Sequence, residues 1–112
     1  MDIVAYQAKQ TAIRMQILET STRGKSAFAL ASMAIEHSGS GAHTAAKLLM
    51  SMEYGTPVNI QDLHRLDTTY RAHAEMALSG CIAHELWPSK WITEEGLADG
   101  ESLMEQLRKK WS

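Results

Sequence analysis

The sequence predicts an all-α fold, a single compact domain of five or six helices arranged as an antiparallel helical bundle. Apolar residues recur at helical spacing, and no segment alternates apolar and polar residues as a half-buried strand would. Strong helix start and stop signals separate these segments. A chain of 112 residues can also bury its own core without disulfides or metal. We expect residues 1–24 to form an N-terminal amphipathic helix and a connection, and residues 25–112 to form the helical core.

The first helix is predicted over residues 3–19, with Asp2 placed to cap it. Residues 20–25 are polar, and Gly24 is expected to mark the break before the next helix, although a continuous helix stays open. The predicted apolar stripe consists of Val4, Ala8, Met15 and Leu18, flanked by Ile13 and Ile17.

Two further helices and a tight turn follow. The second helix is expected to begin near Ser26, and residues 27–35 are apolar almost all round, which is typical of a central helix buried on most sides. Ser-Gly-Ser-Gly at residues 38–41 fits a turn between antiparallel helices. The third helix should run to about Tyr54, with an apolar stripe of Ala45, Leu48, Leu49 and Met52.

Residues 55–67 carry the clearest helix-start signal. Asn59 is a good N-cap, and Asp62 adds negative charge where the helix dipole favours it. Val58 and Leu63 are spaced as a hydrophobic staple. A fourth helix should therefore extend from here to just before Trp87-Pro88, with an apolar seam of Leu63, Leu66, Tyr70, Ala74, Ala77 and Cys81.

The C-terminal region predicts one short and one longer helix. Pro88 is tolerated at a first helical position, and Gly96 can close a short helix over residues 89–96. Asp99 can cap the last helix, in which Glu105 is expected to pair with Lys109. The apolar face of that helix is predicted to be Leu103, Met104, Leu107 and Trp111.

Composition excludes several classes of protein. Eleven Lys and Arg against 13 Asp and Glu give a formal charge of -2, so no global field draws the chain to nucleic acid or anionic lipid. The single Cys81 cannot form an internal disulfide, and the N-terminus lacks the pattern of a secretory signal. No apolar run approaches the roughly 18–20 residues that span a bilayer. We therefore expect a cytoplasmic protein that does not enter the membrane.

The motifs that could bind a cofactor are incomplete. Residues 23–26, Arg-Gly-Lys-Ser, resemble the end of a phosphate-binding loop, but Glu19 stands where the pattern needs a glycine. Cys81 and His84 could share a helical face, yet no pair among the five histidines has the spacing of a metal site. We expect neither a cofactor nor a metal.

No catalytic group is predicted either. Cys81 lies in an apolar stripe beside a glycine, which favours a small buried residue with little thiolate character. Asp62 and Asp67 could suggest an acid and base pair, but capping and surface roles explain them more simply. We therefore expect that the protein is not an enzyme.

Two sets of residues could bind macromolecules. The aromatic residues Trp87, Trp91, Tyr54 and Tyr70 are candidates for contact with a protein partner, with a core role as the alternative for the two tryptophans. The basic residues that could contact nucleic acid are Arg65, Arg71, Arg108, Lys109 and Lys110. Cations at the end of a helix also match its dipole, which is the simpler interpretation of the last three.

Residues 27–111 resemble an uncharacterised domain-of-unknown-function family of small bacterial and mobile-element (prophage-like) proteins. The resemblance is carried by the Ser-Gly turn before residues 45–49, by Tyr54-Gly55, by residues 58–67 and by Trp111. The helix start in that family typically reads Phe-Asp-Leu-Thr-Asp-Leu-Arg-x-Leu-Asp. This chain keeps Asp62, Leu63, Leu66 and Asp67 but has Val58 and Asn59 at the first two positions. The resemblance implies a helical fold and a prophage-like setting, and it names no activity.

The leading hypothesis is a non-enzymatic protein that works by binding another protein. Its forms include an accessory or anti-defence factor acting on a host complex, and self-assembly into a homo-oligomer. The alternative is an accessory or regulatory protein that binds nucleic acid through the basic residues of the fourth and last helices.

Overall fold

The computed structural model describes residues 2–83 and 87–112. Over these residues the fold is all-helical and forms a single globule with no strand, which confirms the predicted fold class. The described residues form six α-helices and one 3₁₀ helix, against an expected five or six helices, and the antiparallel bundle stays a prediction. The elements in chain order are α1 (Ile3–Thr20), α2 (Arg23–Glu36), α3 (Ser40–Tyr54), η1 (Ile60–Arg65), α4 (Thr68–Ala83), α5 (Pro88–Glu94) and α6 (Gly100–Trp111).

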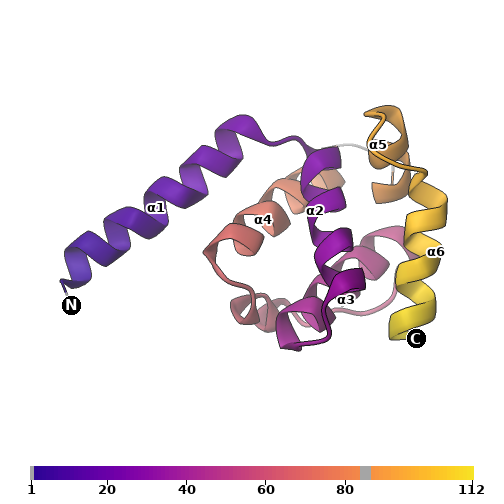
Figure 1. Ribbon diagram of the computed structural model, residues 1–112, viewed down its shortest axis with the longest axis horizontal. Coiled ribbons are helices and arrows are strands. Elements are labelled where there is room, and N and C mark those ends of the chain that lie inside the picture. Colours follow the sequence, from indigo (N-terminus) through magenta and orange to yellow (C-terminus); the bar gives the residue numbers. More distant parts are fainter. Residues whose placement is uncertain (1, 84–86) are drawn as a thin grey trace.

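Helix α2 is the centre of the fold, as its apolar composition predicts. It contacts α3, α4, α5 and α6, while α1 packs against α4 and projects beyond the globule (Figure 1). The projection contributes to the elongated shape, with extents of 44 × 26 × 23 Å. The fully buried larger side chains come from α2, α3, α5, α6 and the end of η1 and include Leu30, Leu48, Leu49, Leu66, Trp91, Ile92, Met104 and Leu107.

Helix α1 begins where predicted but packs with a different face. The Asp2 carboxylate accepts from the backbone N–H of Val4 at 3.0 Å and caps the helix. Most of the predicted apolar stripe nevertheless faces solvent, with Val4 74% and Met15 42% exposed, whereas Leu18 and the flanking Ile13 and Ile17 are half-buried. No residue of α1 is fully buried. The face that contacts α4 also carries polar groups, since Arg14 forms an ion pair with Glu75 at 2.5 Å.

The break between α1 and α2 falls at Ser21 and Thr22, so the expectation that Gly24 marks it is wrong. Thr22 caps α2 by accepting from the Lys25 N–H at 3.1 Å. Gly24 is buried inside α2, where a Cβ would clash with the Glu95 carboxylate and with the backbone carbonyl of Trp91. Glycine is therefore needed here for the close approach of α5 and not for a turn.

The predicted fourth helix is two elements. Asn59 does act as a cap, accepting from the Gln61 N–H at 3.0 Å, but the turn that it starts is the 3₁₀ helix η1. Leu66 is extended, and Asp67 then caps α4 by accepting from the Tyr70 N–H at 2.9 Å. Asp67 is thus a second helix start, and the expectation of one continuous helix is wrong.

Cys81 also departs from the prediction. It is exposed, whereas Leu66, Ala74 and Ala77 of the same predicted seam are buried. The buried face of α4 runs through Ala74, Ala77 and Gly80, so Cys81, one position further along the helix, points away from that face.

The C-terminal helices follow the prediction closely. Pro88 opens α5, Gly96 follows its end with φ 70°, and Asp99 caps α6 by accepting from the Ser102 N–H at 3.2 Å. Glu105 pairs with Arg108 at 2.5 Å, and the expected pairing with Lys109 is not the one observed. Among residues 2–83 and 87–112, none of the helices has the length and apolar character that crossing a bilayer requires.

Candidate functional site

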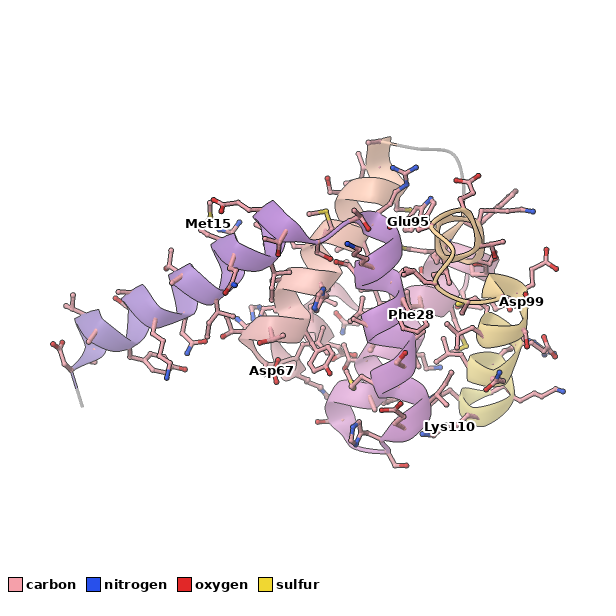
Figure 2. All side chains as sticks on the ribbon, turned by 45° about the horizontal axis from the view of Figure 1, so that its top comes forward. Met15, Phe28, Asp67, Glu95, Asp99 and Lys110 are labelled. Atoms are coloured by element: carbon pink, nitrogen blue, oxygen red, sulfur yellow. The ribbon has the colours of Figure 1, made fainter. Side chains whose placement is uncertain are left out.

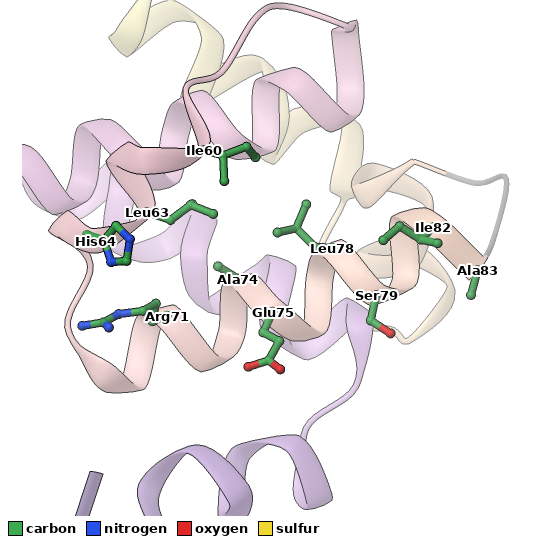
Figure 3. Close-up of a pocket in the computed structure, with 10 residues that line it drawn as sticks. All are labelled: Ile60, Leu63, His64, Arg71, Ala74, Glu75, Leu78, Ser79, Ile82 and Ala83. Carbon is green, nitrogen blue, oxygen red and sulfur yellow. The ribbon is translucent and has the colours of Figure 1, made fainter. Parts of the chain in front are cut away.

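An apolar groove runs between η1 and α4 and encloses about 610 Å³ (Figure 3). The residues of α4 that line it recur every three or four positions, so they form one face of that helix. The opposite wall comes from η1, which is held beside α4 because the chain reverses direction at Leu66 and Asp67. The lining residues are Ile60, Leu63, His64, Arg71, Ala74, Glu75, Leu78, Ser79, Ile82 and Ala83.

The middle of the groove and one end of it are apolar. In Figure 3 the side chains of Ile60, Leu63 and Leu78 converge on the space between η1 and α4. Ile60 is 61% exposed and Ile82 is 86% exposed, so both present large apolar surfaces to solvent. Exposed apolar side chains gathered in one groove are typical of an interaction surface, whereas single exposed ones are not.

The other end of the groove carries polar groups from both walls. His64 and Arg71 lie there, and Arg71 Nε donates to the Leu66 carbonyl at 3.3 Å. Glu75 points toward α1, where its hydrogen bonds with Arg14 at 2.5 and 2.8 Å lower the pKa of the carboxyl. Glu75 is therefore ionised and paired with Arg14, which leaves Arg71 as the cation at this end of the groove.

The aromatic residues predicted to contact a partner lie elsewhere. Trp91 is 1% exposed and belongs to the core, whereas Trp87 is 49% exposed. Tyr54 is exposed at the end of α3, and half-buried Tyr70 lies 6.1 Å from the ring of His73. None of the four lines the groove. Trp87 and Tyr54 stay candidate contacts, while Trp91 is inaccessible to a partner in this conformation.

The predicted basic residues do not form one patch, because each side chain that is paired uses a different partner within the chain. Arg65 lies 3.6 Å from Asp62, and Arg108 pairs with Glu105. Lys110 donates to three carbonyls at the end of α2, those of Ala34 at 2.9 Å, Ile35 at 2.7 Å and His37 (Figure 2). Lys109 is exposed on α6, and of this set Arg71 alone lines the groove.

The phosphate-loop fragment is already occupied by a carboxylate. The Gly24 N–H donates to Glu95 Oε2 at 2.8 Å, and the Thr22 hydroxyl donates to the other oxygen of the same carboxylate. Glu95 thus takes the position at the start of α2 where an anion would bind, so this segment holds α5 to α2.

A serine and a histidine are in contact but do not form a nucleophilic pair. Ser26 Oγ lies 3.0 Å from His73 Nδ1 and 2.8 Å from Ser21 Oγ, and Ser26 is fully buried. Burial also lowers the pKa of His73. Because a substrate cannot reach Ser26, this network joins α2 to α4 and to the end of α1.

The described residues hold no cluster of three or more His, Cys, Asp or Glu side chains suited to a metal ion. His84, the partner suggested for Cys81, lies outside the described residues. Asp62 and Asp67 act at helix starts, where Asp67 accepts from a backbone N–H and Asp62 pairs with Arg65.

No family model, curated protein or solved structure matches this chain.

Proposed function

We propose that this chain is a non-enzymatic, cytoplasmic protein that binds another protein through the groove between η1 and α4. The occupant that fits the groove is an amphipathic helical segment with apolar side chains along one face and an acidic residue at one end. The observation that carries this proposal is the exposure of Ile60 and Ile82 on the two walls of one apolar groove.

The apolar surface supplies the driving force. Covering one fully exposed isoleucine stabilises a complex by roughly 1.5–3 kcal/mol, so Ile60 and Ile82 together contribute several kcal/mol before the cost of association. Leu63 and Leu78 add a partly buried floor between them. A helix that presents apolar residues at positions i, i+4 and i+7 matches a groove of this kind.

Charge selects the orientation of the occupant. Arg71 is permanently charged and lies at the same end of the groove as His64. The negative charge of Glu75 is offset by its ion pair with Arg14. An acidic residue of the partner is therefore favoured beside Arg71, and a basic residue is disfavoured there.

A peptide-display selection tests this proposal even though the partner is unidentified. Random peptides are selected against the wild-type chain and counter-selected against Ile82→Asp, with Val4→Asp as a matched control because Val4 is similarly apolar and exposed on α1. We expect enriched peptides with helical apolar spacing and an acidic end, whose affinity falls at least about tenfold for Ile82→Asp and is unchanged for Val4→Asp. Peptides that bind both variants equally, or no enrichment, would refute the groove as the site.

The nucleic-acid alternative stays a prediction, and no contact in the structure favours it over protein binding. Retention on DNA at low salt that falls as salt rises would support it. The prophage-like setting and a host complex as the partner are likewise proposals that rest on the family resemblance of residues 27–111 alone.

A further inference from the structure

Two charged side chains of α4, Arg71 and Glu75, border both the groove and a smaller cavity between α1 and α4. The smaller cavity encloses about 310 Å³, and both residues belong to its lining as well as to that of the groove. They are four positions apart on α4, so they lie on neighbouring turns of one face and within reach of each other. The charge at this end of the groove therefore depends on how Arg71 and Glu75 are paired.

Arg14 of α1 holds Glu75 away from Arg71. Its Nε donates to Glu75 Oε2 at 2.8 Å and its Nη2 donates to Oε1 at 2.5 Å, so one guanidinium binds both carboxylate oxygens. A two-point contact of this kind is stronger and more directional than a single hydrogen bond. Figure 3 shows the Glu75 side chain directed toward α1, and within the described part of the chain no ion pair joins it to Arg71.

Arg71 is the partner that Glu75 would find without Arg14. Arg71 Nε donates to the Leu66 carbonyl at 3.3 Å, which keeps the guanidinium at this end of the groove. Opposite charges four positions apart on a helix attract each other, and Arg71 stands one turn before Glu75. Pairing of these two side chains would offset the positive charge that Arg71 presents to an incoming acidic residue.

We infer that Arg14 determines the charge specificity of the groove without lining it. By holding Glu75, it keeps Arg71 available to an acidic residue of the partner. Two cations outweigh one anion while Arg14 is present, whereas the charges of Arg71 and Glu75 alone cancel. This inference rests on the proposed groove function, and it assigns the control of that function to a residue of α1.

Peptides from the display selection measure the effect of Arg14 on specificity. Each acidic peptide is compared with the same peptide in which the acidic residue is replaced by its amide. We expect the wild-type chain to prefer the acidic form about fivefold, as for a favourable pair of partly exposed charges, and Arg14→Met to lose this preference. An Arg14→Met variant that keeps the preference would overturn the inference.

Lys9→Met is the matched control for total charge. Lys9 is an exposed cation on the same helix and lines neither the groove nor the smaller cavity. Its replacement should leave the preference for the acidic peptide as in the wild-type chain. An equal loss in Lys9→Met and Arg14→Met would assign the effect to net charge and would overturn the role of Arg14.

The double variant Arg14→Met/Glu75→Gln separates charge from packing. It lacks the same ion pair between α1 and α4, but it has no carboxylate that could pair with Arg71. The preference for the acidic peptide should therefore return. A preference that stays lost would show that Arg14 acts only by holding α1 against α4, and the inference would be wrong.

A titration of the Glu75 carboxyl tests the exchange of partners without any peptide. In the wild-type chain the hydrogen bonds from Arg14 lower the pKa of this carboxyl. Carbon-13 NMR should find the pKa still lowered in Arg14→Met, because Arg71 replaces Arg14, and back in its ordinary range in Arg14→Met/Arg71→Met. An ordinary pKa already in Arg14→Met would overturn the inference.

The two proposals fail in different ways. A selection that yields no peptide counts against the groove, while the Glu75 titration still decides whether Arg14 and Arg71 compete for this carboxylate. Peptides that bind the groove with the same preference in Arg14→Met and in the wild-type chain count against the role of Arg14 alone.

Discussion

Replacement of Leu66 by alanine tests how the groove is built, because Leu66 joins η1 to α4. The side chain is 2% exposed and belongs to the main core. Truncation removes three buried carbons and leaves a cavity, for which buried leucines typically cost about 3–5 kcal/mol. We take about 3 kcal/mol here, since the residue lies between helices where neighbours can relax. With an unfolding entropy of about 2.1 cal/mol/K per residue, a chain of 112 residues loses about 4 °C of Tm for each kcal/mol by which its free energy of unfolding falls.

The expected decrease in Tm for Leu66→Ala is therefore about 13 °C. Thermal unfolding followed by circular dichroism at 222 nm measures it, with denaturant unfolding as an independent value of the free energy. Ile82→Ala is the matched control, since it removes a similar apolar side chain that is 86% exposed and should change Tm by no more than about 2 °C. Equal effects of the two substitutions would show that the assignment of Leu66 to the core is wrong. Leu66→Asp should prevent folding, because it would place a charge in the same position.

Two further predictions concern the contacts of α2. Lys110→Met should lower the free energy of unfolding by about 1–2 kcal/mol, because the Lys110 ammonium donates to carbonyls at the end of α2. Lys109→Met is the control and should have little effect, since Lys109 is exposed on α6. Denaturant unfolding of both variants measures the difference. His73 has its pKa lowered by burial, so the unfolded state binds more protons as pH falls below about 6.5, and stability should decrease from there until the folded-state pKa is passed. The free energy of unfolding, measured between about pH 7.5 and pH 5, should show this loss of stability. If His73→Gln loses the same amount of stability over that range, groups other than His73 cause the loss.

Local chemistry made the helix ends predictable. Asp2 and Asp99 cap the helices that they were expected to cap, since an N-cap needs only one side-chain oxygen near the first turn. Asn59 also acts as a cap, but of the 3₁₀ helix η1 and not of the expected fourth α-helix. The central position of α2 also followed from its composition, because a helix that is apolar all round has to be covered on all sides.

Contacts between elements were not predictable in the same way. The apolar stripe of α1 satisfies helical periodicity, but periodicity alone does not show that Ile13 and Ile17 are half-buried while Val4 and Met15 stay exposed. Asp67 is compatible with both a surface position and a cap, so the break before α4 had no distinct signal. The groove was missed because Ile60 and Ile82 lie on separate elements and come together only after the reversal at Leu66.

Glu95 illustrates the same limit for binding motifs. The fragment at residues 23–26 has the residue types of a phosphate site, but the Gly24 N–H already donates to the carboxylate of Glu95, which follows the last residue of α5. Only the tertiary structure places that carboxylate there, and it converts a possible binding motif into a contact between α2 and α5.

The groove is tested most directly by an amide chemical-shift map of the chain titrated with a peptide from the display selection. Binding in the groove predicts the largest shifts over residues 60–64 of η1 and along α4 from Arg71 to Ala83, with little change in α1 and α6. The same titration of Ile82→Asp should show these shifts greatly reduced at equal peptide concentration. Shifts centred on α1 or α6, or shifts that persist in Ile82→Asp, would contradict the account.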